Sequence, residues 1–160
     1  MSYTALVKKE LSYKNLSKSC CEKALLSAMI RLEGKFAKER NGYFSLRINT
    51  EDNSEARWII FSINRIYSLH SDIRRKKNRF NDKTIFTVKT EASYASESAF
   101  SDLGFMDADA KGNGIFTDIA EYLLSDCDRY SYYRGAFLAC GLIREPKKGY
   151  FLEIASKKIG

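Results

Sequence analysis

Two nine-residue stretches decide how this sequence is expected to fold: LSAMIRLEG at residues 26–34 and YRGAFLACG at residues 133–141. Each stretch ends a segment with the residue pattern of a helix, residues 19–33 in the first case and 126–140 in the second. The glycine that closes each stretch is placed as the C-cap of its helix. The sequence therefore predicts two helices that end in the same way.

The similarity between the two stretches extends along the chain at a constant offset of 107 positions. This offset superposes Cys20 on Cys127, and it superposes Gly42-Tyr43-Phe44 on Gly149-Tyr150-Phe151. A single tripeptide match could arise by chance, but the same offset also aligns the glycines that end the two helices. An internal repeat of one structural unit is therefore predicted.

The two predicted helices each carry small residues four positions apart, which share one helix face and let a partner backbone approach closely. We expect these two faces to pack on each other. The alternative is a pair of unrelated amphipathic helices in one core. The residues of the two faces are Ala24 and Ala28 in the first helix, and Ser131 and Gly135 in the second.

A β-hairpin is predicted directly after each helix. In residues 35–49 the pair Asn41-Gly42 marks the turn, and in residues 142–156 the turn falls at Lys147-Lys148-Gly149. Apolar and polar residues alternate in the returning strand of the first hairpin, so one face should be buried and the other, polar and partly basic, exposed. The residues expected in the core of the second hairpin are Leu152 and Ile154.

The first copy continues with a second helix and a second hairpin. Asp52, followed three positions later by Glu55, has the capping-box pattern of a helix N-terminus. Residues 71–77 and 84–89 predict the two strands of the hairpin. The fold class is therefore α+β, with an αββαββ unit whose second copy is truncated after one helix and two strands.

Three regions follow from this pattern. Residues 1–90 hold an N-terminal helix and the first half, residues 91–126 connect the halves, and residues 127–160 begin the second half. In the connecting region we expect short helices around residues 98–103 and 116–124, separated by a glycine-rich segment. An incomplete second sheet leaves an edge or an apolar face uncovered, so either the chain is a fragment of a longer one or another molecule, such as a second copy, covers the gap.

Composition and charge exclude several classes of protein. The 44% hydrophobic and 29% charged content are typical of a soluble globular domain. No apolar run approaches the ~20 residues that cross a bilayer, and Lys8-Lys9-Glu10 lie where a secretory signal would be apolar. We therefore expect a cytoplasmic protein with no membrane partner. The net charge of +7 favours an anionic partner such as nucleic acid.

The cysteines and histidines give little support to metal or redox chemistry. Cys20, Cys21, Cys127 and Cys140 form neither the CxxC pairs of a zinc site nor a dense disulfide framework. His70 is the single histidine, which excludes chemistry that needs several of them. We expect reduced, partly buried cysteines, with no metal and no cofactor.

Both nine-residue stretches resemble the LAGLIDADG nonapeptide in register. The resemblance implies the fold of the LAGLIDADG homing endonucleases, in which paired helices carry the motifs and two curved antiparallel sheets lie on DNA. Residues 133–141 with PKKGYFLEI at 146–154, SYTALVKKEL at 2–11, and Cys20-Cys21 also resemble the WhiA family of sporulation and cell-division regulators. That resemblance covers essentially the whole chain, although WhiA proteins continue with the rest of the second half and a C-terminal helix-turn-helix.

The WhiA resemblance implies a DNA-associated transcription regulator of cell division, chromosome segregation or sporulation, located at the nucleoid. In the endonucleases the acidic residue before the last glycine of each motif binds a divalent metal. Carried over by position, these residues are Glu33 and Cys140. A lone carboxylate beside a thiol is a poor site for Mg²⁺, which prefers oxygen ligands, and the WhiA family is regarded as having lost cleavage. We therefore expect no nuclease activity and interpret both residues as vestigial.

A run of basic residues at the second predicted hairpin is the sharpest candidate for contact with double-stranded DNA. Basic side chains on a projecting turn neutralise phosphates, and arginine also reaches guanine edges. The alternative is a solvated hairpin that protects a sheet edge. The candidate residues are Arg74, Arg75, Lys76, Lys77, Arg79 and Lys83 in the basic run, Tyr43, Ser45, Arg47 and Asn49 in the first hairpin, and Lys147 and Lys148 in the second copy.

Two other functions are compatible with the sequence. The chain could be a structural or protein-interaction scaffold without DNA contact of its own, with other regulator proteins or a second copy as its partners. It could also be an active nuclease, against which Cys140 argues.

Overall fold

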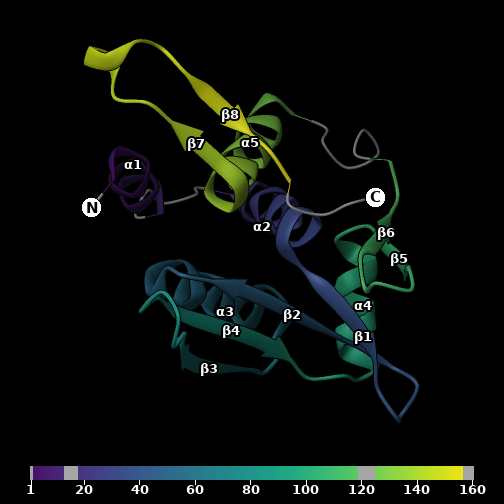
Figure 1. Cartoon of the computed structure of the whole chain (residues 1–160). Helices are drawn as coiled ribbons and strands as arrows, with labels where there is room; N and C mark the ends of the chain where they lie inside the picture. Colours follow the sequence, from purple (N-terminus) through teal and green to yellow (C-terminus); the bar gives the residue numbers. More distant parts are fainter. Residues whose placement is uncertain (1, 13–17, 119–124, 157–160) are drawn as a thin grey trace.

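The computed structural model of the chain describes residues 2–12, 18–118 and 125–156. Its first half has the predicted αββαββ order, preceded by one helix (Figure 1). The elements of this half are α1 (Tyr3–Ser12), α2 (Ser19–Glu33), β1 (Lys35–Lys38), β2 (Phe44–Thr50), α3 (Asn53–Tyr67), β3 (Ser71–Lys77) and β4 (Thr84–Thr90).

The remaining described elements include a hairpin that the sequence did not predict. The connecting region holds α4 (Tyr94–Asp102), β5 (Phe105–Ala108) and β6 (Gly114–Phe116), and the second copy holds α5 (Asp126–Cys140), β7 (Gly141–Ile143), a short 3₁₀ turn, η2 (Pro146–Lys148), and β8 (Leu152–Ile154). The helix expected at residues 116–124 is wrong at its start, because Phe116 ends strand β6. Residues 119–124 lie outside the described part of the chain.

The four strands of the first half form one antiparallel sheet in the order β1-β2-β4-β3. Their register places Ile73, Val88 and Ile48 side by side across three strands. Val88 and Ile48 are fully buried, and α3 packs on β2, β3 and β4. One face of the sheet is therefore covered by helices and contributes to the core, and the other face is not.

Helices α2 and α5 pack closely against each other and separate the four-stranded sheet from the β7–β8 hairpin (Figure 1). The contact is closest at Gly135, where an added Cβ would lie 2.3 Å from the Leu25 backbone oxygen and 3.0 Å from the Ala28 Cβ. Ala24, Ala28 and Ser131 are buried in the same region. Small side chains are thus required where the two backbones meet.

Both helices end at the predicted glycines, but not in the left-handed conformation typical of a glycine cap. Gly34 has φ −70° and Gly141 has φ −77°, which are extended values open to any residue. Space explains the glycines instead. A Cβ on Gly34 would lie 2.6 Å from the Ile30 oxygen, and one on Gly141 would lie 2.4 Å from the Phe137 oxygen.

The N-terminus of α3 is capped as predicted, although the capping box is not formed. The Asp52 side chain accepts a hydrogen bond from the Ser54 backbone N–H at 2.8 Å. Glu55 does not return a bond to Asp52; its carboxylate accepts from Thr50 Oγ1 at 2.5 Å, and Asp52 N–H donates to the same Thr50 oxygen at 3.1 Å. Thr50 therefore links the end of β2 to the first turn of α3.

The β7–β8 hairpin contradicts one expectation about the core. Leu152 and Ile154 are exposed, at 64% and 42% of their full surface, because no described element covers their face. Tyr150 is also exposed, at the entrance to β8. Within the described ranges, no helix is both long and apolar enough to cross a membrane.

Candidate functional site

The basic run Arg74–Lys77 lies within strand β3, where the sequence predicted a strand, so its side chains alternate between two faces. All four residues are exposed along β3, the edge strand. Arg74 pairs with Thr87 and Arg75 with Phe86 of β4, and alternate residues of a strand point to opposite sides of the sheet. Arg74 and Lys76 therefore lie on the uncovered side, and Arg75 and Lys77 on the helix side.

The uncovered side carries basic and polar side chains from three neighbouring strands. Arg47 of β2 pairs with Lys89 of β4, and Asn49 pairs with Thr87, which in turn pairs with Arg74. The Thr87 hydroxyl donates to Asn49 Oδ1 at 2.8 Å, which confirms that these two side chains share a face. We call this surface the open face; its residues are Arg47, Asn49, Arg74, Lys76, Thr87 and Lys89.

Two acidic residues reduce the positive charge of the open face. Glu39, from the β1–β2 turn, lies 3.3 Å from Lys89 Nζ and accepts a hydrogen bond from Ser45 Oγ at 2.7 Å. Hydrogen bonds from Ser45 and Lys89 lower the pKa of Glu39, so it stays ionised and holds Lys89. Asp72 of the edge strand β3 lies opposite Lys89 in the strand register, so its carboxylate is on the same side of the sheet. Ser45 is itself buried, which removes it from the surface that the sequence assigned to it.

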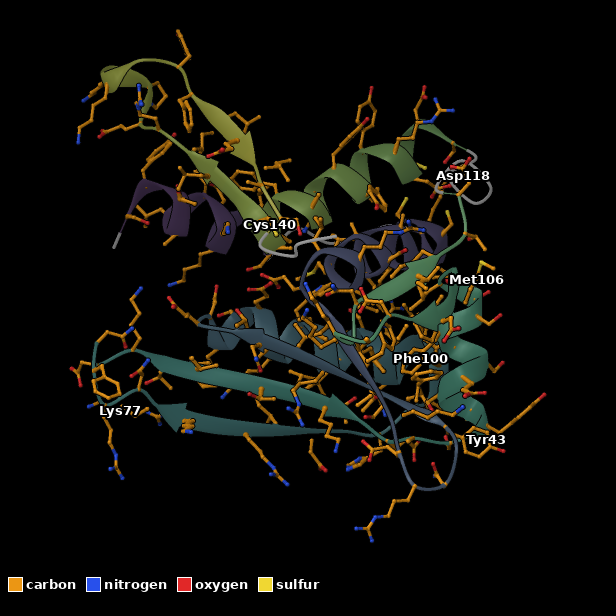
Figure 2. All side chains as sticks on the ribbon, turned by 45° about the vertical axis from the view of Figure 1, so that its right-hand side comes forward. Tyr43, Lys77, Phe100, Met106, Asp118 and Cys140 are labelled. Carbon is orange, nitrogen blue, oxygen red and sulfur yellow. The ribbon has the colours of Figure 1, made fainter. Side chains whose placement is uncertain are left out.

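The other candidates from the first half lie at opposite ends of the sheet. Arg79 and Lys83 belong to the β3–β4 loop, beside Phe80, whose side chain is almost fully exposed. Lys83 Nζ lies 3.6 Å from Glu51. Tyr43 belongs to the β1–β2 turn, at the far end of the sheet from Lys77 (Figure 2).

The two lysines of the second copy do not join the open face. Lys147 and Lys148 lie in η2, at the tip of the β7–β8 hairpin, beyond the α2–α5 pair from the four-stranded sheet (Figure 1). Lys148 Nζ lies 4.0 Å from Glu145. Of the predicted residues, the open face thus gathers Arg47, Asn49, Arg74 and Lys76.

Thr87 and Lys89 were missed in the sequence, although their signal was present. Strand β4 alternates Thr84, Phe86 and Val88 with Ile85, Thr87 and Lys89. The alternation places Lys89 on the other face of the strand from the buried Val88. Which residue of β2 lies beside Lys89, however, depends on the register between β2 and β4. That register links strands separated by a helix and a third strand, and no local pattern specifies it.

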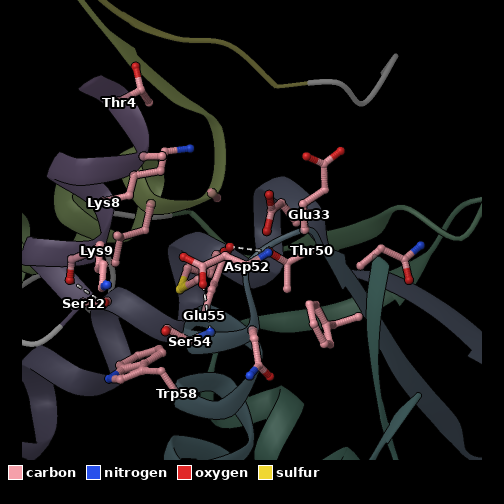
Figure 3. A pocket seen from close by; sticks show the side chains of 18 of the residues that line it. Thr4, Lys8, Lys9, Ser12, Glu33, Thr50, Asp52, Ser54, Glu55 and Trp58 are labelled. Carbon is pink, nitrogen blue, oxygen red and sulfur yellow. Dashed lines mark hydrogen bonds between the residues drawn. The ribbon is translucent and has the colours of Figure 1, made fainter. Parts of the chain in front are cut away.

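Glu33 lies in a cavity of about 850 Å³ between α1, the end of α2 and the start of α3 (Figure 3). Lys8 and Lys9 line it from α1, and Asp52 and Glu55 from α3. The side chain of Glu33 interacts with that of Glu55 in this cavity. Burial raises the pKa of Glu55, opposed by the hydrogen bonds from Thr50 and Glu33 and by Lys8.

The residues around this cavity do not fit the divalent-metal site of the endonuclease fold. That site needs one carboxylate from each motif helix. Here α5 lines the cavity with Leu138 and Ala139, and the carboxyl group that interacts with Glu33 is that of Glu55, from the same half of the chain. At the second motif position stands Cys140, whose thiol prefers softer metals than Mg²⁺.

Sequence comparison identifies relatives of this arrangement. Two family models match the chain, the WhiA N-terminal LAGLIDADG-like domain over residues 19–106 and the WhiA LAGLIDADG-like domain over residues 129–159. Proteins named probable cell division protein WhiA from Desulforamulus reducens and Brevibacillus brevis are 34% and 35% identical over 158 and 157 residues. Each alignment covers 96% of this chain and 48% of the relative, so the chain spans about half the length of these curated relatives.

Solved structures share the fold. The crystal structure of the N-terminal LAGLIDADG domain of DUF199/WhiA matches with a TM-score of 0.67 and 15% identity, covering 98% of this chain and 67% of that one. The crystal structure of full-length DUF199/WhiA from Thermatoga maritima matches with a TM-score of 0.64 and 16% identity, covering 96% of this chain and 44% of that one. The predicted LAGLIDADG-like fold is therefore confirmed.

Proposed function

Because this chain belongs to the WhiA family, we propose that it is a non-cleaving, DNA-associated module of a WhiA-type transcription regulator. The curated relatives carry the name probable cell division protein. The module would act in cell division, chromosome segregation or sporulation, at the nucleoid in the cytoplasm. Its partner is double-stranded DNA, and other regulator proteins are further candidate partners.

One observation carries the proposal: the open face brings four basic side chains together on the side of the sheet that no described helix covers. Arg47, Arg74, Lys76 and Lys89 come from three adjacent strands, with Asn49 and Thr87 between them. Basic groups at this spacing neutralise neighbouring phosphates, and asparagine and arginine can also hydrogen-bond base edges. Binding would be mainly electrostatic and weakly sequence-specific, because contacts to phosphates carry no sequence information.

The module is proposed to bind DNA without cutting it. Cleavage in this fold depends on a pair of metal-binding carboxylates, and the cavity at Glu33 lacks a carboxylate from α5. Replacing Cys140 by Asp would restore an acid at the second motif position. We expect Cys140→Asp to leave a supercoiled plasmid intact in the presence of Mg²⁺, because no carboxylate of α5 lines the cavity at Glu33 in the parent chain.

The test is fluorescence anisotropy of the chain with a ~25-base-pair duplex over a salt series, with Mg²⁺ present and the DNA run on a gel afterwards. Strand β3 supplies a matched pair of variants with the same charge loss. Arg74→Ala with Lys76→Ala removes two cations from the open face. Arg75→Ala with Lys77→Ala removes two from the opposite side of the same strand.

We expect the first double variant to bind more weakly and to reduce the salt slope by about 2, and the second to leave the slope nearly unchanged. Equal losses in the two variants would mean that net charge, and not the open face, attracts DNA. Cut DNA would overturn the non-cleaving role. No binding even at low salt would favour a protein-interaction scaffold, a role to which the exposed Leu142, Tyr150 and Leu152 of the β7–β8 hairpin are suited.

A further inference from the structure

Three of the four cysteines meet at the N-terminal ends of α2 and α5, although one of them lies more than 100 positions from the other two in the sequence. Cys20 and Cys21 lie in the first turn of α2, and Cys127 and Asp128 in the first turn of α5. The three sulfur atoms and one Asp128 carboxylate oxygen all lie within 4.8 Å of one another. No CxxC motif marks this cluster, so the sequence did not predict it.

The cluster repeats the internal symmetry of the chain. The offset of 107 that superposes Cys20 on Cys127 also superposes Cys21 on Asp128. Each copy therefore contributes two adjacent ligand-type side chains from the same turn of the same helix. The two pairs face each other where the helices meet, and together they supply four donors, the number that fills a closed tetrahedral site.

The spacing of the donor atoms fits a single ion. In a tetrahedral zinc site with Zn–S distances of about 2.3 Å, the ligand atoms are separated by about 3.8 Å. The observed limit of 4.8 Å leaves only a small contraction to reach that geometry. Three thiolates and one carboxylate are donors that Zn²⁺ accepts, whereas Mg²⁺ and Ca²⁺ favour sites made of oxygen alone.

Asp128 gives independent support for a ligand at this position. Its side chain is 4% exposed, and among the described residues its Oδ1 atom has no hydrogen-bond partner. A buried carboxylate oxygen without a partner carries a desolvation cost that a bound cation would remove. Both helix N-termini point their positive ends at the cluster, which favours the ionised form of its ligands.

The groups around the cluster act on its thiols in different directions, and the hydrogen bond with Asp128 raises the pKa of Cys20. Ser125 Oγ lies 3.0 Å from Cys127 Sγ, and this hydrogen bond is the main cause of the lowered pKa of Cys127. Ser131 forms a hydrogen bond with Cys21 that also favours its thiolate. Burial nevertheless raises the pKa of Cys21 to about 11, so a bound metal must displace the proton of that thiol.

We propose that Cys20, Cys21, Cys127 and Asp128 bind one Zn²⁺ ion in a structural site that joins the two halves of the chain. All four positions are taken by side chains, so the ion has no open coordination site for catalysis. The ion fastens the N-terminal ends of α2 and α5, at the opposite ends of these helices from Glu33 and Cys140. This role is independent of DNA binding.

The test starts with the full chain purified under reducing conditions, in which zinc is measured by elemental analysis and the zinc-free protein is titrated with Co²⁺. We expect one zinc per chain, and we expect Co²⁺ to give the near-ultraviolet absorption of cobalt–thiolate bonds. Removing the zinc with a chelator should lower the thermal unfolding midpoint, and adding it back should restore the midpoint.

Variants separate the site from a general effect of cysteine loss. Cys21→Ser and Asp128→Asn should weaken Co²⁺ binding by more than the ~10–100-fold typical of losing an outer-shell hydrogen bond. Cys140→Ser is the matched control, because this cysteine lies outside the cluster. This variant should bind Co²⁺ as tightly as the parent chain does. Asp128→Cys keeps four ligands and should bind Co²⁺ at least as tightly, with stronger thiolate absorption.

Two results would overturn the proposal. One is a reduced, folded parent chain that holds no zinc and gives no cobalt–thiolate absorption. The other is equal metal binding in the parent, Asp128→Asn and Asp128→Cys, which would place the metal elsewhere. If Cys21→Ser does not fold, the two Asp128 variants still decide the question, because they leave all three cysteines in place.

Discussion

Gly135 is the residue on which the contact between α2 and α5 depends most directly. An added methyl group would lie 2.3 Å from the Leu25 oxygen, a backbone atom that cannot rotate away. Gly135→Ala gains about 1 kcal/mol of helix propensity, but overpacking a tight contact costs about 1–3 kcal/mol and sometimes more. We expect a net loss of up to about 2 kcal/mol in the free energy of unfolding, measured in urea.

Tyr133→Ala in the same helix is the control for this prediction. Its side chain is largely exposed, so its replacement should change the free energy of unfolding by no more than about 0.5 kcal/mol. If Gly135→Ala is as stable as the parent chain, helices α2 and α5 can move apart at little cost, and the contact at Gly135 does not require a glycine.

Glu55 makes the stability of the chain depend on pH. Burial raises its pKa, with Asp52 acting in the same direction and Thr50, Glu33 and Lys8 opposing. The folded chain therefore holds the proton of Glu55 more tightly than the unfolded chain does. Its contribution to stability is complete below 4.5, the ordinary pKa of a glutamate, and is lost as the pH rises through the raised pKa.

Glu55→Gln keeps the shape of the side chain and removes this titration. We expect its stability relative to the parent chain to increase between pH 4.5 and pH 8, in urea unfolding at a series of pH values. Parallel pH profiles for the two proteins would show that the pKa of Glu55 is the same in the folded and unfolded states, and the raised pKa would then be wrong.

At the scale of single elements, the open face depends on alternation along strands, which the sequence carries only in part. The strand bounds in the first half were predicted almost to the residue, because Asn41-Gly42 and the alternating segments are strong local signals. The run Arg74–Lys77 was predicted on a strand of the second hairpin, but as a single cluster of basic side chains. In a strand it divides between two faces, and only the pairing with β4 decides which half faces away from the helices.

The β5–β6 hairpin was missed for a related reason. Its turn is built from Asp109, whose carboxylate accepts from the backbone N–H groups of Lys111 and Asn113, and from Gly112 with φ +82°. The short strands on either side carry few residues, too few for a periodic signal. Phe105 and Phe116 pack against Phe36 of β1, and this tertiary contact stabilises the hairpin.

Glu39 should weaken the binding of DNA to the open face, because it forms an ion pair with Lys89 of β4. Its ion pair with Lys89 competes with a phosphate for the same ammonium group. Glu39→Gln should free Lys89, so DNA should bind more tightly and the salt slope should steepen by up to about 1. The measurement is the same anisotropy series with a duplex.

The control is Glu10→Gln, which removes one exposed negative charge from α1 instead of from the sheet. It should strengthen binding less than Glu39→Gln does. Equal gains in the two variants would mean that the net charge of the chain controls its affinity for DNA. Lys89 would then not contact the DNA more directly than other basic residues do.

At the scale of the whole molecule, the two halves differ in how well they are packed. The four-stranded sheet contributes Phe36, Leu46, Ile48 and Val88 to the core. The β7–β8 hairpin has two strands of three residues, and every residue of β8 is exposed. Two strands alone are marginally stable in water. The hairpin should therefore open locally while the rest of the chain stays folded.

Hydrogen exchange measured by mass spectrometry tests this difference. Peptides from β7 and β8 should exchange at least about tenfold faster than peptides from β2 and β4, a ratio that corresponds to about 1.4 kcal/mol in opening free energy. Equal protection would mean that the exposed apolar side chains of β8 are covered in solution. Dilution of the sample would then reveal whether a second copy provides the cover.

The repeat in the sequence has a consequence for how this fold can change. Ala28 and Gly135 are equivalent positions of the two copies, and they touch each other. If both halves were identical, one substitution would alter both sides of the contact, and alanine facing alanine would not fit. Two unlike halves can instead divide the space unequally, with the larger side chain on one helix and none on the other. An Ala28→Gly change should therefore rescue Gly135→Ala only in part, because it removes the contact with the Ala28 Cβ but leaves the Leu25 backbone oxygen 2.3 Å from the added Cβ.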